Sequence, residues 1–505
     1  MKKYISIIAA FFMAGVTGCK KDYLSLETNP NTPSVTTPAL SLSAALNASA
    51  AIVAGDYTEY GVWAGYWTTS GNYVPNQTIN QYQITNTSFQ GDWNDWFSNL
   101  TNYNNLQQIA AKDPTQGYYQ AIAMIMKAYG FSHLVDNYND VPYSQAFNLS
   151  KVTFPVYDKG PAIYTDLFKQ LDAAIALIKT GEGKNLIEPG APDIVFGGDN
   201  STATAEMDDW IKFANTLKLR MALRVSNVSG FSAGTIMSTT VSAADDPSTP
   251  ANFLGLGIEA DSNPGYINAS GKQNPYYADY GFDPTGNPVF GNVYWRANAF
   301  SVNMLNSTND PRASALYAPT TSGGIIRGNV FGDPGVKSNP FTSAQGPGLL
   351  KSPEQNAVLL SGAESLFLQA EAAEKGYLTG NAQGLYEAGI TASFEALNVP
   401  NADAAATTYY SQLVPNVNWA TSTNKEQAII TQKWIALNGY FNFEGYNEYR
   451  RTGYPNLPSS IDPAAISPTL PTRLPYPLEE LTTNQANLAK EGTISVFTSK
   501  IFWAK

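Results

Sequence analysis

The sequence predicts a mostly α-helical protein in which TPR-like helix pairs form a superhelix beside a large loop-rich region. Apolar residues recur every three to four positions in several long segments of the 505-residue chain. Segments 361–376 and 382–397 have the length and small-residue content of a tetratricopeptide (TPR) pair, although the full TPR consensus is absent. Over about 229–350 this periodicity disappears, and Gly, Pro, Asn, Ser and Asp dominate. A long irregular insert of this kind is usually functional.

The expected helices follow one another along the chain. Pro161 suits the first position of a helix that starts there, because its missing N–H would have no partner at a helix start. We predict helices over 39–54, 92–111, 115–135, 161–179, 208–225, 354–377, 382–397, 424–438 and 443–451, with a short one near 479–490.

The N-terminus carries an export signal. Lys2 and Lys3 precede an apolar run over 4–16, which is too short for a membrane span of about 20 residues. Small residues then lead into Cys19, the single cysteine of the chain. This pattern is typical of a lipoprotein signal peptide over 1–18, with Cys19 as the acylated first residue of the mature chain. An ordinary signal peptide with an incidental cysteine is the alternative. The polar, proline-containing segment 19–38 then reads as a tether.

Composition excludes several classes of function. The chain has one His and one Cys, so a zinc site, which needs three or four ligands, would consist almost entirely of carboxylates. It has 30 basic and 41 acidic residues, a net charge of −11, which disfavours the phosphate backbone of nucleic acid. We therefore expect no nucleic-acid partner and no cofactor.

The groups that could carry chemistry have simpler structural interpretations. His133 lies on an apolar helix without an evident nucleophile or acid, which favours a packed side chain. A glycosidase needs two carboxyl groups about 5–10 Å apart, but adjacent acids usually form a solvated helix start. Asp279, Asp283 and Asn287 could ligate Ca²⁺, yet the EF-hand pattern is absent and turn-forming side chains are favoured. We assign no catalytic or metal-binding residue. The adjacent acids considered are Asp208, Asp209, Glu479 and Glu480.

Aromatic residues give the strongest indication of a ligand site. They cluster in 57–97, among many Asn and Gln side chains, and again in 263–300. Rings that pack on the C–H faces of sugars, next to amides that bond hydroxyl groups, are what carbohydrate recognition needs, and Tyr and Trp lose little entropy on binding. The alternative is that these rings fill the helical core. The candidate ligand contacts are Trp63, Tyr66, Trp67, Tyr73, Tyr276, Tyr277 and Trp295.

Four segments in order resemble the SusD/RagB family of nutrient-binding outer-membrane lipoproteins, in its second SusD-like branch. The arginines and acids of these segments are expected to pair inside the fold rather than to do chemistry. The segments are Trp93–Leu100 (WNDWFSNL), Asp136–Ala146 (DNYNDVPYSQA, with Asn139 at a position where the family has Gly), Trp210–Arg224, and Gln432–Pro455 followed by Arg473–Pro477.

The resemblance implies one SusD-like domain over 39–505 that is anchored to the outer membrane through Cys19 and faces the cell exterior. It also implies a partner, a SusC-like TonB-dependent β-barrel transporter, over which the lipoprotein closes as a lid. The expected function is non-enzymatic capture of oligosaccharides. A peptide- or other nutrient-binding lid of the same fold is the main alternative, and a lipid-anchored glycoside hydrolase is a third.

Overall fold

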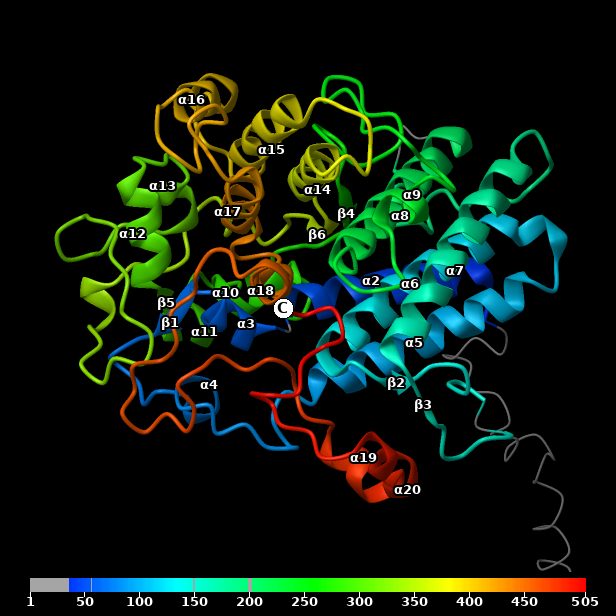
Figure 1. The fold of residues 1–505 in the computed structure, drawn as a ribbon, viewed down its shortest axis with the longest axis horizontal. Coiled ribbons are helices and arrows are strands. Elements are labelled where there is room, and N and C mark those ends of the chain that lie inside the picture. The colour runs from blue at the N-terminus through cyan, green and yellow to red at the C-terminus, as the bar shows by residue number, and fades with distance from the viewer. Residues whose placement is uncertain (1–35, 56, 149, 199–201) are drawn as a thin grey trace, which may run out of the picture.

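The computed structural model describes residues 36–55, 57–148, 150–198 and 202–505, so the predicted signal peptide, Cys19 and nearly all of the tether lie outside the described residues. Helices dominate (Figure 1). They are α2 (Pro38–Gly55), α3 (Thr58–Trp63), α4 (Gln77–Asn80), α5 (Gly91–Ala110), α6 (Gly117–Tyr138), α7 (Gly160–Gly181), α8 (Ala203–Arg224), α9 (Ala233–Met237), α10 (Pro275–Tyr280), α11 (Phe290–Tyr294), α12 (Ala299–Ser307), α13 (Ala313–Leu316), α14 (Gly362–Glu374), α15 (Ala382–Ala396), α16 (Ala402–Tyr410), α17 (Lys425–Leu437), α18 (Asn442–Thr452), α19 (Leu478–Thr483) and α20 (Gln485–Leu488), with 3₁₀ turns at Pro114–Gln116, Asn339–Phe341 and Ala489–Glu491.

Two groups of helices form the scaffold. Helices α2, α5, α6, α7 and α8 pack side by side at one end of the molecule, and α14 to α17 cover the top in the view of Figure 1. The α5–α6 pair packs closely because Gly130 has no side chain: a Cβ there would lie 2.7 Å from the Trp96 ring. Trp93, Trp96 and Leu100 are buried, which confirms the prediction that this stripe is core.

The stretch Pro38–Trp63 is long and apolar enough to cross a membrane by composition alone. In the structure, however, α2 is a core helix. Asn99 of α5 donates from Nδ2 to the carbonyl oxygen of Ala45 at 3.0 Å, and the hydroxyl groups of Ser49 and Tyr103 lie 2.8 Å apart. Leu42 and Leu46 are fully buried against the rest of the core.

Most predicted helices are confirmed within a few residues at each end. The exception is 354–377, whose first part is strand β6 (Ala357–Leu360); α14 starts only at Gly362, where the Ser361 side chain accepts a hydrogen bond from the Glu364 N–H. A side-chain cap of this kind satisfies one of the free N–H groups of a helix start. Apolar spacing does not predict α3, α4, α9 to α13 or α16.

The strands form three short antiparallel pairs, β1–β5, β2–β3 and β4–β6. They are β1 (Trp67–Thr69), β2 (Val141–Pro142), β3 (Tyr157–Asp158), β4 (Ala260–Ser262), β5 (Trp295–Ala297) and β6. In the β1–β5 pair, Trp67 faces Ala297 and Thr69 faces Trp295. Because the strands are antiparallel, the chain that leaves β1 runs beside the chain that enters β5, so two segments more than 200 residues apart become neighbours.

The region 229–350 is irregular, as predicted. Its helices are short, and the longest of them, α12, has 9 residues. Figure 1 shows much of this region at the end of the molecule opposite α5 to α7, around α11, α12 and α13.

Candidate ligand-binding face

Five of the seven aromatic candidates are core residues, and their prediction as ligand contacts is corrected here. Trp63, Tyr66 and Trp67 are 1%, 0% and 1% exposed, and Tyr276 and Trp295 are also buried. The Tyr66 hydroxyl donates to the carbonyl oxygen of Trp434 at 2.6 Å. These rings lie in α3, in the turn after α3, and in β1, α10 and β5. The high density of aromatic residues in this part of the sequence reflects the core. Composition alone does not distinguish rings that pack on one another from rings that pack on a sugar.

The other two candidates, Tyr73 and Tyr277, reach the surface. Tyr73 is 36% exposed, and Tyr277 is half-buried. Tyr73 meets two rings of the second aromatic cluster: its centroid lies 5.7 Å from that of Phe290 and 5.5 Å from that of Tyr294. Phe290 and Tyr294 stack at 5.0 Å. The structure thus brings one ring of the first sequence cluster and two rings of the second into a single group at the surface, and we call Tyr73, Phe290 and Tyr294 the aromatic face.

Phe290 is the most exposed ring of the aromatic face, at 64%, and it was not among the candidate contacts. Its place in the second aromatic cluster, between Pro288 and Gly291, is the signal that could have found it. Tyr294 is buried behind the other two rings. A large apolar side chain held in solvent usually marks an interaction site when it belongs to a group rather than standing alone.

Backbone pairing holds the aromatic face in place. Beyond the β1–β5 pair, the Ser70 N–H donates to the carbonyl oxygen of Tyr294 at 2.9 Å, and the Tyr294 hydroxyl donates to the carbonyl oxygen of Val74 at 3.2 Å. The Gly71 N–H donates to the carbonyl oxygen of Lys337 at 3.0 Å. The loop that carries Tyr73 is therefore tied to two other segments, and its ring needs little ordering when a ligand binds.

The segment that carries Tyr73, and the segment bonded to it, also carry amide side chains. Asn72 and Gln77 are exposed, and Asn339 is partly exposed. The Asn72 Oδ1 accepts a hydrogen bond from the Asn339 N–H at 2.7 Å, and the Ser70 hydroxyl donates to the Asn339 Oδ1 at 2.5 Å. Neutral donors and acceptors beside exposed rings can bond hydroxyl groups while the rings cover C–H faces.

The motif residues lie elsewhere, in a buried ionic cluster made by Asp136, Arg220, Arg224, Glu364, Glu371, Lys433, Glu444, Glu448 and Arg451. Arg220 binds Glu364 through two hydrogen bonds of 2.8 and 2.6 Å, and Arg451 binds Glu371 through two of 2.7 Å. Arg224 contacts both Asp136 and Glu444. The cluster ties together α6, α8, α14, α17 and α18.

This confirms the expectation that the arginines pair inside the fold. Burial alone would raise the pKa of Glu444, but the guanidinium groups of Arg224 and Arg220 lower it well below its usual value. Burial opposes the ionisation of Glu448 too, yet Arg451 and Lys433 hold its pKa at about 2. Both carboxylates stay charged at neutral pH, because their partners are fixed within hydrogen-bond distance.

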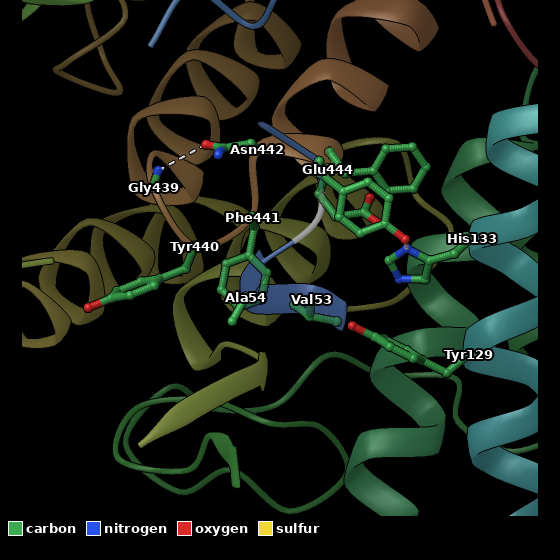
Figure 2. Close-up of a pocket in the computed structure, with 11 residues that line it drawn as sticks. Val53, Ala54, Tyr129, His133, Gly439, Tyr440, Phe441, Asn442 and Glu444 are labelled. Atoms are coloured by element: carbon green, nitrogen blue, oxygen red, sulfur yellow. Dashed lines mark hydrogen bonds between the residues drawn. The ribbon is translucent and has the colours of Figure 1, made fainter. Parts of the chain in front are cut away.

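His133 packs beside this cluster. Its ring stacks on Trp96 and Phe443 with centroids 5.0 and 5.1 Å away, and its Nδ1 lies 3.2 Å from the Tyr57 hydroxyl. Burial lowers its pKa to about 3, so it is neutral at physiological pH. The adjacent cavity, between His133, Glu444 and the turn at Gly439, holds about 10 Å³ (Figure 2). That is room for about one water molecule rather than a substrate.

Three of the other carboxyl groups considered from the sequence have structural roles. Asp283 Oδ1 accepts hydrogen bonds from the N–H groups of Thr285 and Asn287 at 2.8 and 3.0 Å, which is a turn. Asp209 pairs with Lys212 one helical turn later, and Glu480 accepts a hydrogen bond from the Tyr157 hydroxyl. Within the described ranges, His, Cys, Asp and Glu side chains form no group of three that could hold a metal ion.

A helical scaffold locked by buried ion pairs, with an irregular region that presents rings and amides, defines a binding protein of the helix-repeat class. The chain belongs to the SusD-like family: the family model described as "Starch-binding associating with outer membrane" matches residues 30–477. It is thus a nutrient-binding protein of the SusD type, in a family of binding proteins associated with the outer membrane. No curated protein matches the chain.

Solved structures share the fold. A SusD-like protein from Bacteroides thetaiotaomicron is 24% identical, with a TM-score of 0.71 over 92% of this chain and 98% of its own. A chitin-binding SusD homologue from Flavobacterium johnsoniae is 23% identical, with a TM-score of 0.70 over 92% and 98%. A structure described as a chitin-binding protein is 24% identical, with a TM-score of 0.73 over 92% and 99%. These likenesses establish the fold, and the predicted TPR-like helical architecture is confirmed.

Proposed function

We propose that this protein captures oligosaccharides on the aromatic face. The observation that carries the proposal is the meeting of Tyr73 and Phe290, two solvent-exposed rings from distant segments with centroids 5.7 Å apart. The exposed amides of Asn72 and Gln77 lie close to Tyr73 in the sequence. The family's description as starch-binding, and the chitin-binding descriptions of two similar structures, support a glycan as the ligand.

We extend the proposal to the membrane anchor and the partner of this protein. Cys19 carries the lipid that anchors the chain to the outer membrane, with the protein facing the cell exterior. The protein works as the lid of a SusC-like TonB-dependent transporter and must release its cargo, so its affinity is about micromolar or weaker. Replacing Cys19 by Ser should leave the protein out of the membrane fraction. Mild detergent extraction of native membranes should recover the wild-type chain with a large barrel protein.

A glycan and peptide array tests the ligand class. The chain without residues 1–19 should bind malto- or chito-oligosaccharides and not the peptides. Binding to peptides alone would favour the peptide-binding lid of the same fold. Incubation of the same preparation with the bound glycan, followed by analysis of the products, should return the glycan intact; cleavage would favour the glycoside hydrolase instead.

A further inference from the structure

A second cavity lies far from the aromatic face. It is enclosed by α5, α6, α7 and the segment 143–147, and its volume is about 280 Å³. In Figure 1 these helices occupy the end of the molecule opposite α11, β1 and β5. Such a volume is at the lower limit of ligand pockets and fits one sugar-sized molecule.

The wall of this cavity contains a lysine. Lys127 of α6 is half-buried, and its Nζ donates to the Asn104 Oδ1 at 2.9 Å and to the Gln107 Oε1 at 3.0 Å. Both partners are neutral amides from α5. An ammonium group has three donors, so these two bonds leave one of them for another acceptor.

Two buried lysines of the described chain each have a carboxylate partner, whereas Lys127 does not. Lys433 contacts Glu448 at 2.8 Å, and Lys218 contacts Asp172. In the part of the chain that the structure describes, no carboxylate lies within 4.0 Å of Lys127. A partly buried charge without a close counter-charge is costly, and a ligand that brings a carboxylate within hydrogen-bond distance would relieve that cost.

The rest of the cavity suits a small polar molecule with an apolar face. Phe131 and Phe147 supply rings, and Tyr143, Ser144 and Gln170 supply hydrogen-bonding groups. Asp166 of α7 accepts the Tyr143 hydroxyl at 2.5 Å and attracts Lys127 at longer range.

We propose that this cavity binds a small organic carboxylate no larger than a monosaccharide, such as a uronic acid, whose carboxylate accepts the free donor of Lys127. The site is separate from the aromatic face, so it can hold a second kind of ligand or the acidic end unit of a glycan. Burial lowers the pKa of Lys127 to about 8, so the ammonium form still predominates at pH 7.

Calorimetric titration with D-glucuronate and with neutral D-glucose tests the proposal on the chain without residues 1–19. At pH 7 we expect saturable binding of glucuronate, at least tenfold tighter than that of glucose. Lys127→Met should weaken glucuronate binding at least tenfold. Lys169→Met, which removes the same charge from an exposed site on α7, should leave it unchanged. Tyr73→Ala should also leave it unchanged, so failure of the aromatic face and failure of this site are distinguishable.

A pH profile on the unmutated chain provides a second test that needs no variant. Between pH 7 and pH 9.5 the Lys127 ammonium group loses its proton, so glucuronate affinity should fall roughly 30-fold for a pKa of about 8. Tyr143, whose pKa burial raises, stays protonated over this range. Absence of glucuronate binding, equal binding by Lys127→Met, or an affinity independent of pH would overturn the proposal.

Discussion

The buried ionic cluster and the aromatic face are opposite in almost every respect. The cluster joins five helices through charged side chains that are nearly all inaccessible, and it contains the residues that made the family recognisable. The aromatic face consists of two exposed rings and one buried ring, carried by a loop and by the short helix α11, and no motif marked it. The recognisable part of this sequence therefore encodes the scaffold, whereas ligand contact depends on which rings the scaffold leaves in solvent. Loops on a rigid support are where recognition usually resides.

The largest effect is expected from breaking the cluster. Glu444→Gln would leave Arg224 and Arg220 with one fewer counter-charge in a fully buried setting. Removing one partner of a buried ion pair costs about 3–5 kcal/mol of unfolding free energy. Urea unfolding monitored by circular dichroism would measure this. Glu354→Gln, at an exposed position, is the matched control and should change the unfolding free energy by less than about 0.5 kcal/mol.

Removal of a core ring should lower the stability of the fold, as breaking the ionic cluster should, rather than lower glycan affinity alone. Trp67 is 1% exposed and packs on Tyr280 with centroids 5.0 Å apart. Trp67→Ala should therefore lower the unfolding free energy by about 3–5 kcal/mol through the cavity it leaves. If this variant melts like the wild type and loses only glycan affinity, the correction of the sequence prediction is itself wrong.

A buried carboxyl group should make the stability of the fold depend on pH. Burial raises the pKa of Glu59, in α3, to about 7, and its side chain hydrogen-bonds with Asp92. Because the folded pKa exceeds the unfolded one, the contribution of Glu59 to stability is present at low pH and is lost as pH rises through about 7. The loss is at most about 1.4 kcal/mol per pH unit.

Glu59→Gln removes this titration. Relative to the wild type, the variant should gain stability between pH 5 and pH 8, as measured by urea unfolding at both values. An unchanged difference between the two proteins across that range would show that Glu59 does not retain its proton in the folded state.

The smallest effects on stability, and the specific effects on binding, belong to the aromatic face. Tyr73→Ala or Phe290→Ala should each remove about 0.5–1.5 kcal/mol of binding free energy, by analogy with aromatic pairs. That is a loss of about 2- to 12-fold in glycan affinity. Calorimetry with the oligosaccharide selected by the array, alongside thermal unfolding, separates the two quantities. A collapse of the melting temperature would assign these rings to the core.

Sequence reasoning predicted the scaffold well because the signals it needs are local. Apolar spacing located α5, α6, α7, α8 and α15 to within a few residues, and the paired arginines followed from their place on buried helix faces. The start of α14 was wrong because strand β6 and helix α14 are both apolar, and the Ser361 cap that separates them is a single residue.

The ligand site was harder, because exposure depends on contacts between distant segments. Trp67 and Tyr73 lie six residues apart in one aromatic cluster, yet one is in the core and the other is on the surface. The difference is set by the pairing of β1 with β5, more than 200 residues away. Composition identified the two segments that meet at the aromatic face, but it could not identify which of their rings remain exposed.

A crystal structure of the glycan complex would show whether the sugar lies on the aromatic face. Crystals of the chain without residues 1–19, soaked with the oligosaccharide that the array selects, should show a sugar ring against Tyr73 or Phe290 and hydroxyl groups within hydrogen-bond distance of Asn72 or Gln77. The ionic cluster should be unchanged. An oligosaccharide bound elsewhere, with both rings still bare to solvent, would contradict the account.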